Sequence, residues 1–229
     1  MSDLLYEKHD FHAVFTYNRP ERLNSLGGQL LNELTEAMKD FDADPSMRVG
    51  IVTGTGRAFS AGGDLKEMAE GSFERKPQTE TYPYSGNPKP FIAAINGLAV
   101  GGGMETALDC DIRICSTDAY FGLFEPKRGI MAGYATKHLS RVIGLSAANY
   151  ILLTADRIEP MQALKWGIVT EVVEPEQLLP RAEEIATLIV ENAPLSVEGT
   201  KAQIQEWRLT KIDEAWRLGN WVHKVIHAS

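Results

Sequence analysis

Apolar and polar positions along the chain repeat with two periods, one typical of strands and the other typical of helices. Apolar runs bounded by Gly, Pro, Asn or Asp predict strands over residues 12–18, 48–56, 90–97, 111–117 and 168–175. Apolar residues at helical spacing predict a helix through Leu30, Leu31, Leu34, Met38 and Phe41. Strands that alternate with helices predict an α/β core with mainly parallel pairing.

Two segments fall outside this alternation. Residues 72–89 are polar, contain three prolines and show no period, which predicts a mobile surface loop. From Glu176 onward the pattern is helical to the end of the chain, with an interruption at Ala193 and Pro194. We therefore predict a core over residues 1–193 and a separate helical region over residues 194–229.

Charge and composition argue against several classes of protein. The formal net charge is −8 and no Lys/Arg block forms a basic patch, which disfavours nucleic acid or an anionic membrane as partner. The first ten residues are acidic and lack a long apolar core, so no secretory signal is predicted. No apolar run approaches the roughly 18 residues needed to cross a bilayer. We expect a cytoplasmic protein, with Cys110 and Cys115 as core thiols.

Three consecutive glycines, Gly101 to Gly103, stand between an apolar run and a helical segment that carries Glu105. The first turn of a helix presents unpaired N–H groups, and glycine lets a ligand oxygen approach them closely. Glu105 lies three residues past Gly102, hence on the same helical face. This arrangement suits proton chemistry beside a polarised carbonyl. Tight backbone packing at Gly103, with Glu105 in solvent, is the alternative that stays open.

A second glycine turn, in the stretch AFSAGGDLKEM, precedes a short helix that Asp64 is predicted to cap. It is neither a Walker loop nor a dinucleotide fingerprint, because the Gly-Lys-Ser/Thr end and the third glycine are both missing. A backbone donor near Gly62 and Gly63 remains, with Arg57 and Lys66 nearby to meet phosphates. Two such turns could supply both N–H groups of one oxyanion hole.

Five stretches follow one another along nearly the whole chain: NRPERLNSL, AFSAGGDLKEM, KPFIAAINGLAVGGGMETALDCDIRI, FGLFEPKRGI and LTADRIEPMQALKWGIVTEVVEPEQL. Together they resemble the enoyl-CoA hydratase/isomerase (crotonase) superfamily, and the paired AGGDL and GGGMETA motifs are the specific part of that resemblance. It implies an α/β spiral of repeated ββα units with a C-terminal helical region that builds a trimer or a dimer of trimers. It also implies an acyl-coenzyme A thioester as substrate and neither a metal nor another cofactor.

The resemblance implies roles for individual residues. The N–H groups of Gly63 and Gly102 match the two oxyanion donors, and Glu105 and Glu125 match the two catalytic carboxylates of hydratases. The helical phase points independently to Gly102 and Glu105, whereas Glu125 rests on the resemblance alone. The residues implied to contact coenzyme A or the acyl group are Arg22, Ala61, Gly62, Asp64, Leu65, Lys66, Gly101, Phe124 and Tyr134.

The segment around Glu125 departs from the family pattern. Phe124 and Ala132 replace prolines, and Tyr134 stands where a small residue is common. These positions line the acyl pocket by resemblance, so the acyl chain of the substrate stays open. Most relatives carry a further helical segment beyond the position of Ser229, so we expect part of the oligomerisation region to be missing.

We expect a hydro-lyase that adds water to a 2-enoyl-CoA thioester, or removes it, with two glutamates serving one step. A Δ3-Δ2 enoyl-CoA isomerase, which needs one competent base, is the alternative enzyme. A catalytically idle acyl-CoA-binding or RNA-binding relative is the alternative from another class, and the negative charge weighs against RNA.

The remaining polar and aromatic candidates are predicted to be structural. His223 and His227 are four residues apart on a helix but lack a third metal ligand nearby. His138 is expected on a helix surface, and Asp109 and Asp111 between a helix and a strand. The tryptophans of the tail are expected to be packing or subunit-interface anchors: Trp207, Trp216 and Trp221.

Overall fold

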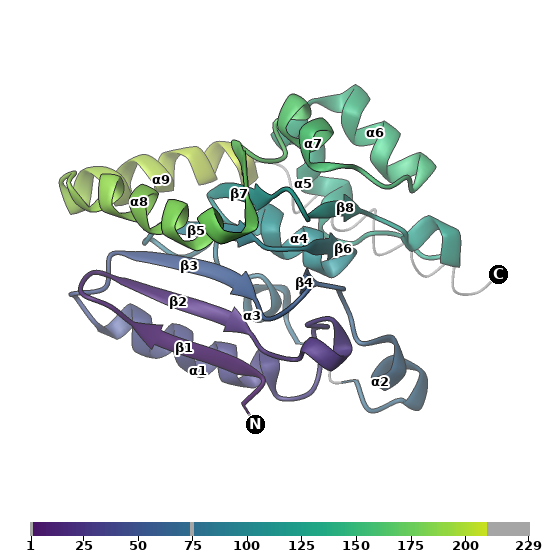
Figure 1. The fold of residues 1–229 in the computed structure, drawn as a ribbon, viewed down its shortest axis with the longest axis horizontal. Helices are drawn as coiled ribbons and strands as arrows, with labels where there is room; N and C mark the ends of the chain where they lie inside the picture. Colours follow the sequence, from purple (N-terminus) through teal and green to yellow (C-terminus); the bar gives the residue numbers. More distant parts are fainter. Residues whose placement is uncertain (1, 74–75, 210–229) are drawn as a thin grey trace.

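Two sheets organise this computed structural model, which describes residues 2–73 and 76–209 of the 229-residue chain (Figure 1). The larger sheet has the strand order β1-β2-β3-β5-β7-β9, in which only β1 is antiparallel to its neighbour. The smaller sheet has the order β4-β6-β8 and is entirely parallel. The strands are β1 (Leu4–Lys8), β2 (His12–Tyr17), β3 (Val49–Gly54), β4 (Ala58–Ser60), β5 (Phe91–Ile95), β6 (Leu98–Val100), β7 (Ile112–Ser116), β8 (Tyr120–Gly122) and β9 (Glu171–Val173).

The chain repeatedly passes from a strand of the larger sheet to a strand of the smaller sheet and then into helix. After β3 and β4 come α2 (Leu65–Glu70) and α3 (Gln78–Thr81), and after β5 and β6 comes α4 (Gly102–Asp109). After β7 and β8 come the 3-10 helix η2 (Glu125–Arg128), α5 (Ala135–Ile143), α6 (Leu145–Thr154) and α7 (Pro160–Trp166). Because β4, β6 and β8 are parallel, the segments that follow them leave the smaller sheet at the same edge.

Helices cover both faces of the larger sheet (Figure 1). The short η1 (Pro20–Arg22) precedes α1 (Leu30–Ala43), and η3 (Pro175–Gln177) precedes α8 (Leu178–Val190). Along β5, Phe91, Ala93 and Ile95 pack into the core that contains the apolar side of α1, whereas Ile92 and Ala94 pack against α8. Alternate side chains of a strand point to opposite faces, so this strand is buried on both.

The last described helix, α9 (Pro194–Leu209), is joined to the core by buried polar groups. Lys201 Nζ donates hydrogen bonds to the carbonyl oxygens of Tyr84 and Lys89, each at 2.9 Å, and lies 2.7 Å from Asp111 Oδ2. Gln205 Nε2 donates to Asp111 Oδ1 at 3.1 Å. The division of the chain at residue 194 therefore stays a prediction, and α9 itself contacts the core. Trp216, Trp221, His223 and His227 lie outside the described residues.

The expected mobile loop over residues 72–89 is wrong for its second half. Tyr84 is fully buried, and its backbone N–H donates to Asp109 Oδ2 at 2.8 Å. The Tyr84 hydroxyl lies 2.6 Å from the hydroxyl of Tyr17. A polar, proline-containing segment can thus be fixed by partners that are remote in sequence, which local composition does not reveal.

Candidate active site

The first glycine turn follows β4 and lies against the segment before α1. Leu26 N–H donates to the Gly62 carbonyl oxygen at 2.7 Å, and Asp64 N–H donates to the Leu26 carbonyl oxygen at 3.3 Å. These bonds use the groups on either side of Gly63, so the N–H of Gly63 points away from Leu26. Gly62 has a φ of +83°, which favours glycine at this position.

Two buried polar side chains of the NRPERLNSL stretch hold this turn in place. Arg19 donates to Asp64 Oδ2 at 3.1 Å and to Glu67 Oε1 at 2.9 Å. The side-chain amide of Asn24 donates to the carbonyl oxygen of Ala58 at 2.7 Å. Sequence reasoning used this stretch to recognise the family and to assign Arg22 to coenzyme A, but it gave no role to Arg19 or Asn24.

The carboxylate of Asp64 stabilises this turn through hydrogen bonds. It caps α2 by accepting from the N–H groups of Lys66 and Glu67, and it also accepts from the hydroxyl of Ser25 at 3.0 Å. The cap predicted at Asp64 is confirmed. Its predicted contact with coenzyme A stays a prediction.

The second glycine turn lies directly on the first. A Cβ placed on Gly62 would stand 2.7 Å from the Gly102 nitrogen, and one placed on Gly102 would stand 3.3 Å from Gly62 Cα. Gly102 begins α4, so its N–H lacks an acceptor within that helix. Gly103 is pressed against the Ser60 carbonyl, which no side chain would allow. Tight packing therefore explains both Gly62 and Gly103, whereas the N–H of Gly102, at the beginning of α4, is left for a ligand.

Glu105 is buried, with 5% of its surface exposed, and its carboxylate accepts three hydrogen bonds. Oε1 accepts from the backbone N–H groups of Tyr134 and Ala135 at 2.8 and 2.9 Å, at the beginning of α5. Oε2 accepts from the hydroxyl of Tyr82 at 2.7 Å. These bonds occupy three of the four lone pairs of the carboxylate. A carboxylate oxygen has two lone pairs, so only Oε2 retains one for a further donor.

Glu125 lies across Gly101 from Glu105, in a less polar environment. A Cβ on Gly101 would stand 3.2 Å from Glu125 Oε1, and Glu125 Oε2 is buried without a hydrogen-bond partner among the described residues. Burial, and then the charge of Glu105, raises the pKa of Glu125 to about 7, and Arg128 opposes this shift. The structure thus brings together a carboxylate held by three donors and one whose raised pKa lets it keep its proton near neutrality.

Tyr134 is buried behind Glu105, with 2% of its surface exposed. Its hydroxyl donates to Asp109 Oδ1 at 2.6 Å and accepts from Arg208 Nη2 of α9 at 2.7 Å. The backbone N–H of Tyr134 binds Glu105, so this residue links α9 to the glutamate. The prediction that Asp109 is structural is confirmed, because it is fully buried and accepts from Tyr84 and Tyr134.

The residues expected near coenzyme A differ in exposure. Arg22, Leu65 and Lys66 are exposed, with Lys66 Nζ 3.9 Å from Glu70 Oε1. Ala61 and Gly101 are half-buried. Phe124 is half-buried as well, and the Lys127 ammonium lies 5.1 Å from the centre of its ring.

The expectation that His138 lies on a helix surface is wrong. Only 1% of its surface is exposed, and its ring stacks on Tyr134 with centroids 3.8 Å apart. Neither ring nitrogen has a hydrogen-bond partner among the described residues. Burial, and then the charges of Arg208, Lys137 and Arg141, lowers the pKa of His138 to about 3.

His138 is therefore expected to weaken the fold in mild acid. In the unfolded chain the His138 side chain takes up a proton near pH 6.5, whereas in the folded chain it does so only near pH 3. Between pH 6.5 and 5 this group should lower the free energy of unfolding by about 2 kcal/mol. We expect the fall to be smaller in His138→Phe, measured as the slope of unfolding free energy against pH in urea titrations. Equal slopes would exclude a buried neutral imidazole, whatever the packing cost of the larger ring.

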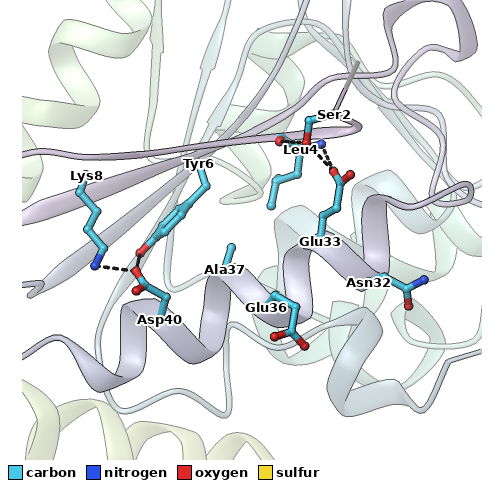
Figure 2. A pocket seen from close by; sticks show the side chains of 9 residues that line it. All are labelled: Ser2, Leu4, Tyr6, Lys8, Asn32, Glu33, Glu36, Ala37 and Asp40. Atoms are coloured by element: carbon cyan, nitrogen blue, oxygen red, sulfur yellow. Dashed lines mark hydrogen bonds and ion pairs between the residues drawn. The ribbon is translucent and has the colours of Figure 1, made fainter.

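A surface hollow of about 770 Å³ lies between β1 and α1. Figure 2 shows that polar groups around it pair with one another: Lys8 and Tyr6 bind Asp40, and Ser2 and the Leu4 N–H bind Glu33. The residues that line the hollow include none from the glycine turns and neither Glu105 nor Glu125. We therefore place the candidate active site at the glycine turns.

Within residues 2–73 and 76–209, no group of three His, Cys, Asp or Glu residues is arranged to hold a metal ion. No helix in the same ranges combines the length and the apolar character needed to span a bilayer.

Comparison with known proteins gives consistent matches to one family. The family model for enoyl-CoA hydratase/isomerase matches residues 9–215. The short-chain-enoyl-CoA hydratase of Clostridium acetobutylicum is 38% identical over 226 residues, which cover 94% of this chain and 85% of the relative. The (E)-benzylidenesuccinyl-CoA hydratase of Thauera aromatica is 43% identical over 203 residues, which cover 82% of this chain and 77% of the relative.

A solved structure agrees with these matches in fold. The crystal structure of enoyl-CoA hydratase from Mycobacterium tuberculosis H37Rv superposes with a TM-score of 0.89 at 34% identity, with 100% of both chains covered. The sheet order, the paired glycine turns and these similarities lead to one conclusion. The chain belongs to the enoyl-CoA hydratase/isomerase family.

Proposed function

We propose that this chain adds water reversibly to the double bond of a 2-enoyl-CoA thioester. Its family and the hydratase names of its relatives support this reaction. The observation that carries the proposal is the arrangement of two glutamates beside the glycine turns. Glu105 accepts three hydrogen bonds, whereas Glu125 Oε2 is buried without a hydrogen-bond partner among the described residues and the pKa of Glu125 is raised to about 7. Such a pair suits a reaction in which one proton is taken up and another is delivered.

The glycine turns supply the electrostatic part of the mechanism. Attack of water on the β-carbon moves negative charge to the thioester oxygen, which becomes an enolate oxygen. Gly102 is the first residue of α4, so its N–H is free of the helix. The N–H of Gly63 points away from its bridge partner Leu26. We assign both to the oxyanion hole, where each donor is worth about 3 kcal/mol of transition-state stabilisation.

The glutamates supply the proton transfers. Glu105 accepts the proton of the attacking water at the free lone pair of Oε2, because both lone pairs of Oε1 are already bound to N–H groups. Protonated Glu125 gives its proton to the α-carbon. The product carries the hydroxyl group on the β-carbon, and the new proton on the α-carbon removes the negative charge of the enolate. The two carboxyl groups end with exchanged protonation states, which solvent restores, and no cofactor is required.

The binding and assembly assignments belong to the same proposal. Leu65 and Lys66 lie on α2, Ala61 follows β4, and Arg22 ends η1. All four are half-buried or exposed, which suits contact with the long coenzyme A moiety. The region 194–229 is assigned to self-association as a trimer or a dimer of trimers, in the cytoplasm. Light scattering at micromolar concentration tests the assembly.

A panel of enoyl-CoA thioesters with different acyl chains tests the reaction itself. The expected result is loss of the conjugated thioester absorbance with at least one short or branched substrate and formation of the 3-hydroxyacyl-CoA product. Movement of the double bond without uptake of water would instead support the isomerase alternative. Binding of the thioesters without turnover would support an idle acyl-CoA-binding protein.

The protonated state of Glu125 predicts how hydration depends on pH. Its pKa is raised to about 7, so the proton donor is lost as the pH rises through that value. We expect kcat/KM to fall about tenfold per pH unit above this point. The measurement is a pH profile of hydration between pH 5 and 9. The residual rate of Glu125→Gln should lack this alkaline limb, and a limb that persists in the variant would assign it to another group.

A further inference from the structure

Tyr82 contacts the candidate base, although the sequence reasoning gave it no role. It follows α3, on the excursion between the two sheets that was predicted to be a loop. Its hydroxyl lies 2.7 Å from Glu105 Oε2, and its ring centre lies 4.9 Å from that of Tyr134. The side chain is half-buried, with its ring packed on Tyr134 and its oxygen on Glu105.

The hydroxyl of Tyr82 is the only side-chain donor to Glu105 among residues 2–73 and 76–209. The other two donors are backbone N–H groups, and both bind Oε1. Among the described residues, Tyr82 is therefore the group that occupies one lone pair of Oε2 and leaves the other for water. A charge-assisted bond of this length also favours the ionised form of the acceptor.

Tyr82 also lies beside the assigned oxyanion donor. A Cβ placed on Gly102 would stand 3.4 Å from the Tyr82 oxygen. The phenol oxygen is thus close to the first turn of α4 and to the carboxylate that projects from its next turn. A thioester carbonyl bound at the Gly102 N–H would place its reacting carbons near this hydroxyl.

The phenol stays protonated and can therefore donate to Glu105. Burial, and then the negative charge of Glu105, raises the pKa of Tyr82 well above its usual value, and Asp109 and Glu125 act in the same direction. Other charged groups face Glu105 from the neighbouring helices, namely Glu125 of η2 and Lys137 of α5. Burial lowers the pKa of Lys137 to about 8, so its titration falls on the alkaline side of any profile.

We propose that Tyr82 is a positioning residue whose hydroxyl keeps Glu105 ionised and leaves one lone pair of Oε2 directed at the attacking water. The effect of Tyr82 on catalysis depends on the proposed hydration reaction. Its effect on Glu105 depends only on the hydrogen bond between the two side chains.

The experiment compares the whole protein with Tyr82→Phe, which keeps the ring that packs on Tyr134 and removes only the oxygen. Infrared spectra recorded across a pH titration report the carboxylate bands, and Glu105→Gln identifies the band of Glu105 by its loss. We expect the titration of that band to move upward by about one pH unit in Tyr82→Phe. In hydration assays kcat should fall about tenfold, KM should stay within about twofold, and the acidic limb should move to higher pH.

Tyr84→Phe is the matched control, because it removes a phenol oxygen from the same segment that is bound to Tyr17 instead of Glu105. It should leave the Glu105 band and the acidic limb in place. An unmoved band in Tyr82→Phe, or a moved band with unchanged kcat, would overturn the positioning role. An upward shift of the band in a protein that hydrates no enoyl-CoA would refute the proposed reaction and leave the hold of Tyr82 on Glu105 standing.

Discussion

Glu105→Gln and Glu125→Gln are each expected to lower kcat for hydration by about 10² to 10⁴. The first variant loses the acceptor for the proton of water, and the second loses the donor to the α-carbon. Both side chains keep their size, so affinity for a non-reactive CoA thioester should stay nearly unchanged. The measurements are steady-state hydration rates and calorimetric binding of a saturated acyl-CoA.

The double variant separates a shared step from two independent ones. If both carboxyl groups serve one addition, the double variant should be little slower than the slower single variant. Glu36→Gln is the control, because Glu36 is an exposed partner of Lys39 on α1. Undiminished hydration by Glu125→Gln would break the pairing, and retention of double-bond migration alone would replace the hydratase assignment by that of an isomerase.

Gly62→Ala is expected to abolish most hydration by acting on the backbone. The new Cβ would stand 2.7 Å from the Gly102 nitrogen and 2.9 Å from the Val100 carbonyl oxygen, and neither backbone atom can rotate away. Loss of access to one oxyanion donor costs about 10² to 10³ in kcat. The variant should also be less stable, because Gly62 has a φ of +83°. Hydration rates are to be compared at a temperature where circular dichroism shows the variant folded.

Gly71→Ala provides the control for backbone strain. Gly71 also has a positive φ, of +69°, but no atom lies within 4 Å of its would-be Cβ. It should lose stability through the same backbone strain, without the steric clash of Gly62→Ala, and retain its hydration rate. If the two variants lose hydration equally, strain and not the blocked N–H group explains the effect.

The sequence predicted the elements whose patterns are long and regular. The apolar positions of α1 and the strands β2, β3, β5 and β7 lie where periodicity places them. The strands of the smaller sheet have three residues each and were not predicted, because three residues show no period. The crotonase fold was predicted by resemblance, and the family match and the solved structures confirm it.

The candidate site could be predicted only in part. Glu105 follows from helical phase within one element, whereas Glu125 reaches the same place through the pairing of β6 with β8. Tyr82 and His138 owe their surroundings to contacts with α4, α5 and α9 that span many residues of chain. Such contacts form only in the folded chain, so local sequence patterns do not predict them.

The Glu125 Oε2 atom, which is buried without a hydrogen-bond partner among the described residues, favours catalysis but lowers the stability of the fold. A carboxyl group with a folded pKa of about 7 and an ordinary value of 4.5 lowers stability as the pH rises from 4.5 to 7, by about 3 kcal/mol. Selection for heat resistance alone would therefore favour replacing Glu125 by a neutral side chain. Directed evolution for stability should be expected to erode this position first, so a library screened without an activity assay would drift toward stable proteins with a disabled acid.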